Sequence, residues 1–213
     1  MLHWLAEARA ALVPPARRDG ALLVDMGCGG GLLGPHVAGK GYHHVGVDLT
    51  GSALASALFH GVVPVRGDVA ALPIADASAD VVCAGEILEH VSDCSAVVAE
   101  ACRVLSPGGT LVVDTIASTR LANLIAVELA ERIPGAAPPG IHDPALFVDR
   151  KALVAACAAN GVPLTLRGLR PRWSELVGWA ARRRDSVTMV PLWTTSVLFQ
   201  GWGVKTAPDT GAR

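Results

Sequence analysis

The sequence predicts an α/β fold in which a doubly wound, mostly parallel sheet of seven strands carries helical cover elements. Short apolar runs alternate with helical patterns from residue 21 to residue 115, which is typical of parallel strands joined by crossover helices. A glycine-rich turn follows the first run, and Asp25, Asp48 and Asp68 stand at or just after the ends of the first three. Because ligands of such folds bind at the carboxyl ends of the strands, these residues predict a binding site there.

Composition limits the classes of protein to consider. The chain has 213 residues, of which 51% are hydrophobic, and we expect a single domain over residues 1–213. A formal net charge of −1 gives no electrostatic reason to expect nucleic acid as a partner. No apolar run reaches the roughly 18 residues of a membrane span, and no signal peptide is evident. The five cysteines form no C-x-x-C pair, so we expect free thiols and a cytoplasmic location.

The elements up to residue 115 follow from these patterns. Residues 1–20 are expected to form an N-terminal arm with a helix over residues 2–13, where leucines lie on one face and Pro14-Pro15 ends the helix. The expected strands are 21–25, 44–48, 62–66, 79–84 and 110–115, and the expected helices are 31–40, 51–60 and 93–105.

After residue 115 the alternation becomes irregular, and segments 116–148 and 170–194 are expected to be insertions. Residues 119–133 have the pattern of an amphipathic helix with Leu121, Leu124, Ile125 and Leu129 on one face. Its polar face is not strongly basic, so packing on the sheet or in a dimer is favoured over membrane binding. A Pro/Gly-rich loop over 134–140, a helix over 149–160 and strands at 163–169 and 195–204 complete the expected elements.

The glycine-rich turn predicts the class of ligand. Gly27, Gly29 and Gly31 alternate between the first strand and the next helix, where the chain turns tightly and a ligand can approach the backbone. Asp48 follows about 20 residues later, where an acidic residue accepts ribose hydroxyls. This pattern fits two classes of ligand, dinucleotides and S-adenosylmethionine (SAM).

Residues 22–115 resemble the class I SAM-dependent methyltransferases, which have a Rossmann-like methyltransferase fold. The segments that carry the resemblance are Val24-Asp25-Met26-Gly27-Cys28-Gly29-Gly30-Gly31, Gly46-Val47-Asp48, Gly67-Asp68-Val69, Glu86-Ile87-Leu88-Glu89-His90-Val91 and Leu105-Ser106-Pro107-Gly108-Gly109-Thr110. The resemblance implies SAM as cofactor.

The resemblance also implies roles for individual residues. The backbone of Gly27, Gly29 and Gly31 would approach the methionine part of SAM, and Asp25 would orient the turn or the ammonium group. Asp48 would accept both ribose hydroxyls, because a carboxylate offers two acceptor oxygens. The remaining expected cofactor contacts are Leu49, Asp68 to the adenine amino group, the Val69 amide to the adenine ring, and Glu86.

Residues 22–169 are similar, more narrowly, to the O-methyltransferases of ubiquinone biosynthesis, which methylate polyprenylated catechols. The residues concerned are Glu86-x-x-Glu89-His90, Thr115-Ile116, Gly140-Ile141-His142-Asp143 and Phe147, whereas the tail differs. Glu86, Glu89 and His90 would share one face if a helix begins there, and two carboxylates with one imidazole suit Mg²⁺ or Mn²⁺. In the alternative, Glu86 caps the helix, and Glu89 and His90 line the SAM pocket without metal.

The expected reaction is methyl transfer to a hydroxyl group of a small molecule with neighbouring hydroxyls. His142 is the expected general base, Asp143 would orient it or bind the metal, and His90 is the third catalytic candidate. The two insertions would then lie on the acceptor side. The tryptophan-rich tail also resembles sugar O-methyltransferases of mycobacteria, and a mannoside-like sugar is favoured over a polyprenylated catechol as acceptor.

Two alternatives from other classes remain open. A nicotinamide (NAD(P)) oxidoreductase would use the same turn, since Gly29, Gly31 and Gly34 match G-x-G-x-x-G, but it leaves the other segments unexplained. A SAM-binding protein without catalysis is the second. A homodimer is expected from the frequency of such assemblies.

Overall fold

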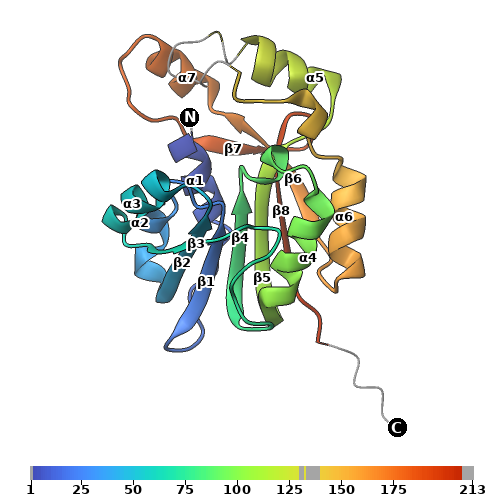
Figure 1. Ribbon diagram of the computed structural model, residues 1–213. Helices are drawn as coiled ribbons and strands as arrows, with labels where there is room; N and C mark the ends of the chain where they lie inside the picture. Colours follow the sequence, from blue (N-terminus) through green and yellow to red (C-terminus); the bar gives the residue numbers. More distant parts are fainter. Residues whose placement is uncertain (1, 130–131, 133–139, 208–213) are drawn as a thin grey trace.

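The computed structural model describes residues 2–129, 132 and 140–207, and its strands lie in one sheet (Figure 1). Within the described residues the eight strands are β1 (Ala21–Met26), β2 (Tyr42–Asp48), β3 (Val63–Arg66), β4 (Ala79–Gly85), β5 (Leu105–Ile116), β6 (Thr165–Pro171), β7 (Met189–Leu192) and β8 (Leu198–Val204). The expected α/β class with a mostly parallel sheet is therefore confirmed.

The sheet has a parallel part and an antiparallel part. The strand order is β3-β2-β1-β4-β5-β8-β6-β7, in which β1 to β5 run parallel and β8, β6 and β7 pair antiparallel. The sequence predicted seven strands, and the eighth, β7, lies in the segment expected to be an insertion. Among the described strands, β7 pairs only with β6, where Gly168 faces Leu192. With four residues, β7 is too short to show a recognisable alternation of apolar and polar side chains.

Helices cover both faces of the sheet (Figure 1). The α-helices of the described residues are α1 (Leu2–Ala10), α2 (Gly34–Val37), α3 (Gly51–Phe59), α4 (Cys94–Val104), α5 (Arg120–Asn123), α6 (Arg150–Ala159) and α7 (Trp173–Ala180). Alternate strand residues point to opposite faces. Val24, Val82 and Leu111 belong to the core that packs on α4 and α6, whereas their neighbours Leu23 and Val81 belong to the core beside α1 and α2.

The expected helix over residues 119–133 is confirmed in part, because residues 120–129 are helical. The chain forms α5 and then a π-helix, η3 (Leu124–Leu129). Residues 130–131 and 133–139, which include most of the expected loop over 134–140, lie outside the described residues. Its leucine stripe is not the buried face, because Leu121 and Leu124 are 47% and 44% exposed. The small side chains of Ala122 and Ala126 are buried instead and allow a close approach to the neighbouring elements.

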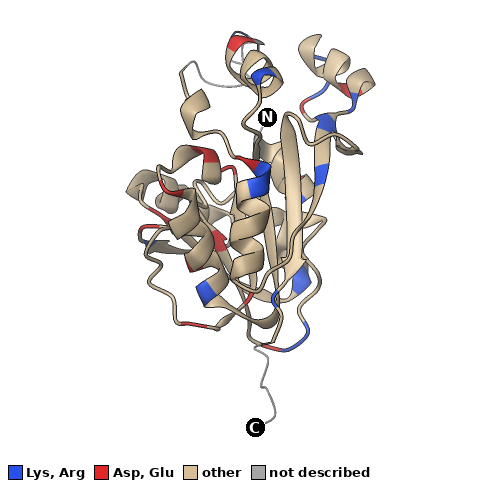
Figure 2. Cartoon of the chain, turned by 90° about the vertical axis from the view of Figure 1, so that its right-hand side faces the viewer, with Lys and Arg blue, Asp and Glu red and all other residues tan. Residues whose placement is uncertain are grey.

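The second insertion contains α7, which the sequence did not predict. The Trp179 ring meets that of Trp4 from α1 edge-on, with centroids 5.2 Å apart, and the Glu175 carboxylate accepts the Thr188 amide at 2.7 Å. In both views α5 and α7 stand at the end of the molecule opposite the C-terminus, beyond the carboxyl ends of β1, β4 and β5 (Figures 1 and 2). No helix of the described residues is long and apolar enough to cross a membrane.

Candidate functional site

The glycine-rich turn at the end of β1 has the backbone that its composition predicts. Gly27, Gly29 and Gly31 all have positive φ, between 51° and 76°. A side chain at Gly31 would come within 2.9 Å of the Ala57 backbone in α3, so this glycine serves packing. A side chain at Gly29 would meet nothing within 4 Å. The backbone of Gly29 therefore borders open space, which a ligand can fill.

Asp48, at the end of β2, connects the loop after β1 to the loop after β2 through its carboxylate. Its Oδ2 accepts the amide of Gly29 at 2.9 Å and its Oδ1 accepts the amide of Thr50 at 2.8 Å. Each carboxylate oxygen has two lone pairs, so both oxygens keep one acceptor position for a ligand. The half-buried side chain is held in one orientation before any ligand binds.

The other residues expected to bind SAM lie at the same edge of the sheet, where the parallel strands end. They differ in their exposure to solvent. Asp25 is buried, with Nε2 of His44 3.5 Å from its carboxylate, which favours a role in supporting the turn. Asp68 is exposed and its Oδ1 accepts the amide of Ala70 at 2.8 Å, while the neighbouring Val69 is buried. Leu49 is 61% exposed beside Asp48, an apolar side chain available to a flat ligand surface.

The helix expected to begin at Glu86 does not form. Glu86 has a left-handed backbone with φ 52°, and its amide donates to the carbonyl of Asp114 in β5 at 2.8 Å. Only a short 3-10 helix, η2 (Leu88–His90), follows, and Asp93 caps α4 by accepting the amide of Ala96. The alternative role of Glu86 as a helix cap is therefore also wrong.

Glu86, which is half-buried, and Glu89, which is buried, are two carboxyl groups whose pKa values are raised. Burial raises the pKa of Glu89 to about 7, and its Oε2 accepts the Thr115 hydroxyl at 2.7 Å. Burial also raises the pKa of Glu86, and the neighbouring Glu89 and Asp114 raise it further. Oε1 of each glutamate is buried without a hydrogen-bond partner among the described residues.

The expected metal site of Glu86, Glu89 and His90 is not supported. Within the described part of the chain, no group of three or more His, Cys, Asp or Glu side chains is arranged to hold a metal ion. The reason is local: Glu86 lies outside η2, Glu89 turns inward to Thr115, and His90 is exposed. The three side chains therefore do not share the helix face on which the expectation rested.

Two histidines from distant segments meet beside this edge. The rings of His90 and His142 lie nearly parallel, at 19°, with centroids 6.3 Å apart. The rings of His142 and Phe147 meet edge-on, with centroids also 6.3 Å apart. Partial burial of its ring lowers the pKa of His90, and His142 lowers it further. The Oδ1 of Asp143 accepts the amide of Ala145 at 2.9 Å, so this carboxylate caps the short helix η5 (Pro144–Leu146).

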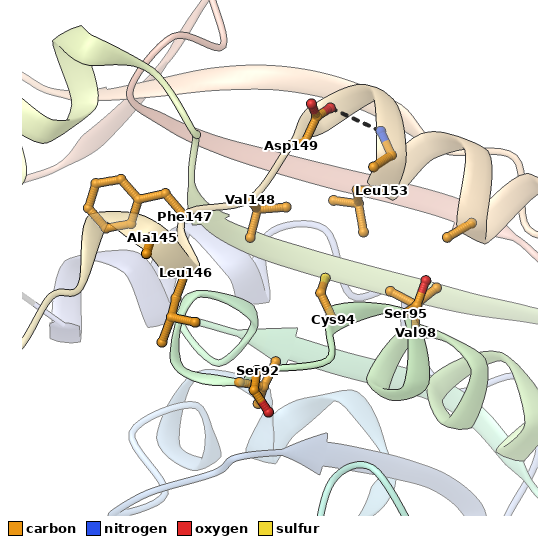
Figure 3. A pocket seen from close by; sticks show the side chains of 13 residues that line it. Ser92, Cys94, Ser95, Val98, Ala145, Leu146, Phe147, Val148, Asp149 and Leu153 are labelled. Carbon is orange, nitrogen blue, oxygen red and sulfur yellow. Dashed lines mark hydrogen bonds between the residues drawn. The ribbon is translucent and has the colours of Figure 1, made fainter.

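A cavity of about 240 Å³ opens next to the histidine pair. Segments 91–98 and 145–156 line it, so that its walls are the amino-terminal parts of α4 and α6. Cys94 and Leu153 point toward one another across it, and Asp149 caps α6 at its rim (Figure 3). Phe147 both lines the cavity and contacts His142, so its ring lies between the cavity and the histidine pair.

Arg9 forms a buried ion pair beside the site, and the sequence did not predict it. Its guanidinium forms two hydrogen bonds to the Asp114 carboxylate, at 2.5 and 2.8 Å, and both side chains are buried. Although burial alone would lower the pKa of Arg9, Asp114 raises it. Arg9 lies so close to Gly85 that a side chain there would come within 1.7 Å of its central carbon. A signal existed, because Arg9 continues the helical stripe of Leu2, Leu5 and Leu12.

Comparison with known sequences points to one family. The family described as "Methyltransferase domain" matches residues 24–113. The ubiquinone biosynthesis O-methyltransferase of Ralstonia nicotianae is 36% identical over 175 residues, which are 78% of this chain and 73% of that protein. The protein of the same name from Paraburkholderia phytofirmans is 40% identical over 148 residues, or 66% of this chain and 63% of that protein.

Comparison with solved structures supports the fold. A SAM-dependent methyltransferase of Thermotoga maritima superposes with a TM-score of 0.68 at 16% identity, over 96% of this chain and 89% of that one. Phosphoethanolamine N-methyltransferase 2 of Haemonchus contortus, in complex with SAM, superposes with a TM-score of 0.66 at 15% identity, over 96% and 53%.

Proposed function

The chain belongs to the class I SAM-dependent methyltransferases, and on that premise we propose that it methylates a hydroxyl group of a catechol, an aromatic ring with neighbouring hydroxyls, in the synthesis of a quinone. The observation that carries this proposal is the meeting of His90 and His142 beside an apolar cavity, at the edge that holds Gly29 and Asp48. Membership in this family also favours SAM over a nicotinamide dinucleotide as the ligand of the glycine turn.

The proposed SAM site uses residues at the ends of β1, β2 and β3 and in the loops that follow them. The backbone at Gly29 borders the methionine part of SAM, Asp48 accepts the ribose hydroxyls, and Asp68 and the amide of Val69 hold the adenine. Gly27, Gly31 and Asp25 shape and support the turn, and Leu49 and Glu86 complete the walls. When bound, SAM supplies an electrophilic methyl group and leaves as a thioether.

The protein's own part in the reaction is to position the acceptor and remove a proton. His142 accepts the hydroxyl proton while the acceptor oxygen bonds to the methyl carbon, and the electron pair of the broken carbon–sulfur bond stays on sulfur. His90 is the second proton-accepting group of the pair, and its lowered pKa keeps its ring neutral near pH 7. Asp143 acts by holding the loop that carries His142. No step is assigned to a metal.

The relatives and the cavity support the proposed acceptor class. The similar proteins are named as ubiquinone biosynthesis O-methyltransferases, which favours the catechol over the mannoside-like sugar that the sequence suggested. Valine, leucine and phenylalanine side chains line much of the cavity beside His142. A cavity of roughly 150 Å³ takes up benzene, so this larger one has room for a substituted ring or the start of an apolar side chain.

The test is methyl transfer with three acceptors. Purified protein is incubated with SAM and a 4-alkyl catechol, the matching monophenol or a methyl mannoside, and formation of S-adenosylhomocysteine is measured. We expect turnover with the catechol only. Replacing His142 by Ala should lower kcat by about 10²–10⁴-fold, the usual contribution of a general base, while calorimetry shows unchanged SAM affinity.

The control is His36→Ala, which removes an exposed histidine from α2. It should leave both kcat and SAM affinity unchanged. Transfer to the mannoside but not to the catechol would overturn the acceptor assignment. An unchanged kcat in His142→Ala would overturn the role of His142.

A further inference from the structure

Buried carboxyl groups outnumber cations at the edge of the sheet that carries the glycine turn. Among the described residues, Arg9 is the only buried lysine or arginine, whereas the carboxyl groups of Asp25, Glu89 and Asp114 are buried. Glu86 adds a further, half-buried carboxyl group. The guanidinium of Arg9 forms both of its hydrogen bonds with Asp114. Within the described part of the chain, neither Glu86 nor Glu89 forms a salt bridge, so the two glutamates lack a cation of their own.

The two glutamates lie between the glycine turn and the cavity proposed for the acceptor. Glu86 directly follows β4, which pairs with β1, and the side chain of the next residue, Ile87, lies within 2.6 Å of the place where Gly27 would carry a Cβ. On the other side, burial raises the pKa of the Cys94 thiol in the cavity wall, and acidic groups near it, among them Glu89, raise it further. The pair therefore lies where a methyl donor held by the turn meets an acceptor in the cavity.

The fold holds these glutamates in an unfavourable state. Glu86 has a left-handed backbone with φ 52°, which glycine adopts more readily than a residue with a Cβ. Oε1 of each glutamate is buried without a hydrogen-bond partner among the described residues, and burial of an unpaired polar group costs free energy. Strained backbone angles and unpaired polar groups cluster at ligand sites. A ligand that brings positive charge would stabilise both glutamates at once.

The positive charge that fits this place best is the sulfonium of SAM. Within the described residues, no group of three or more His, Cys, Asp or Glu side chains is arranged to hold a metal ion. The catechol carries no positive charge. The ammonium group of SAM lies at the other end of its methionine part, whereas the sulfonium carries the methyl group itself. The sulfonium must therefore lie where donor and acceptor meet, beside Glu86 and Glu89.

We propose that Glu86 and Glu89 recognise the sulfonium charge, so that the chain binds SAM more tightly than its product, S-adenosylhomocysteine. The inference rests on SAM as the ligand of the glycine turn and not on the identity of the acceptor. Methyl transfer leaves the electron pair of the carbon–sulfur bond on sulfur, which becomes a neutral thioether. The attraction to the glutamates is then lost, and the product leaves the site more readily than SAM. Both glutamates act on binding, and neither takes the hydroxyl proton.

The test is calorimetric binding of three ligands to the full chain in the presence of EDTA, at a pH above the pKa of Glu89, which burial raises to about 7. The ligands are SAM, S-adenosylhomocysteine and sinefungin, whose ammonium group stands in the place of the sulfonium. We expect SAM and sinefungin to bind about tenfold more tightly than S-adenosylhomocysteine, the effect of one unit charge about 10 Å away at an effective dielectric constant of about 20. Glu86→Gln and Glu89→Gln should each reduce this preference and leave the affinity for S-adenosylhomocysteine unchanged.

Two further variants are the matched controls. Glu7→Gln makes the same chemical change at an exposed position of α1 and should keep the full preference for SAM. Glu86→Asp keeps the charge, and aspartate tolerates a left-handed backbone, so this variant should keep most of the preference. Equal affinities of the unaltered chain for all three ligands overturn the proposal. An equal loss of affinity for all three ligands in the glutamine variants also overturns it.

Magnesium and the acceptor give two more outcomes. Binding of Mg²⁺ in the absence of SAM and EDTA, if Glu89→Gln abolishes it, overturns the proposal, because the glutamates would then hold a metal ion. A preference for SAM that the glutamine variants lose, without methyl transfer to the catechol, supports this inference and overturns the proposed acceptor.

Discussion

The donor region, residues 21–91, and the cover, residues 117–148 and 170–197, use their side chains in opposite ways. In the donor region the polar groups are fixed by the backbone, as Asp48 is by the amides of Gly29 and Thr50. In the cover, Trp173 and Trp193 are largely exposed, and so are Arg182 and its neighbours. The donor region therefore holds its polar groups in fixed positions, whereas the cover exposes large side chains to solvent.

This difference separates what the family shares from what is particular to this chain. The matched family segment, residues 24–113, covers nearly all of the donor region and none of the cover. Changes in the donor region should therefore affect SAM binding, and changes in the cover should affect which molecule is presented to it. Arg9 joins the parts, because α1 contacts both Trp179 of the cover and Asp114 at the end of β5.

The largest expected effect comes from breaking that link. Arg9→Met leaves Asp114 buried without its cation, and loss of one partner of a buried ion pair costs about 3–5 kcal/mol. Urea unfolding measures this loss. Arg18→Met is the matched control, because Arg18 makes the same two-bonded contact with Asp80 at the surface and should cost at most about 1 kcal/mol. Equal losses in the two variants would contradict the role of burial.

The next effect concerns pH. The pKa of Glu89 is raised from 4.5 to about 7 in the folded chain, so the folded state binds this proton more tightly than the unfolded state does. Stability from this proton is complete below pH 4.5 and is lost as pH rises through about 7. In Glu89→Gln the fall between pH 4.5 and 8 should shrink, by at most about 3 kcal/mol. Urea unfolding at several pH values tests this, with the exposed Glu7→Gln expected to retain the full fall.

Substitution of Asp48 tests whether its carboxylate binds the ribose of SAM. Asp48→Ala removes a carboxylate that holds two amides and offers two free lone pairs, and calorimetry should show SAM affinity reduced about 100-fold, as expected for hydrogen bonds to a charged group. Asp149→Ala also frees two amides, those of Lys151 and Ala152, but at the start of α6. It should lower Tm and leave SAM affinity intact; a similar loss of affinity in both would point to general destabilisation.

The smallest effect distinguishes backbone strain from ligand approach at Gly29. Gly29→Ala and Gly20→Ala introduce a methyl group at positive φ into open space, at 51° and 70°. Each should cost about 1 kcal/mol of stability. Only Gly29→Ala should weaken SAM binding, by about tenfold, because only there does a ligand approach the backbone. Unchanged SAM affinity in Gly29→Ala would place the ligand elsewhere.

The same two regions differ in how well the sequence predicts them. The apolar runs at 21–25, 44–48 and 79–84 predict β1, β2 and β4 to within two residues, because buried parallel strands carry unbroken apolar sequence. α7 and β7 give no comparable signal, since contacts with distant residues such as Trp4 stabilise them. At Glu86 the spacing of the motif predicts a helix, but the bond of its amide to the distant Asp114 carbonyl decides the backbone.

For the site residues, the sequence predicts their positions in the fold better than their hydrogen-bond partners. It places Gly29, Asp48 and Asp68 at one edge because the carboxyl ends of parallel strands meet there. It does not predict that Glu89 turns to Thr115, or that Asp143 caps a helix, because these bonds depend on which short elements form. The meeting of His90 and His142 depends on contacts of the segment 140–148 with distant residues, which no local pattern encodes.

The position of β8 has a consequence for synthesis of the protein. β8 is the last strand of the described chain, yet it lies between β5 and β6 and pairs with both. While the ribosome extends the chain, β6 and β7 have no place in the sheet and β5 keeps an open edge until residues 198–204 emerge. Open strand edges recruit other chains. Chains that stop before residue 198 should therefore aggregate or be degraded, and only chains that include β8 should accumulate in the cell.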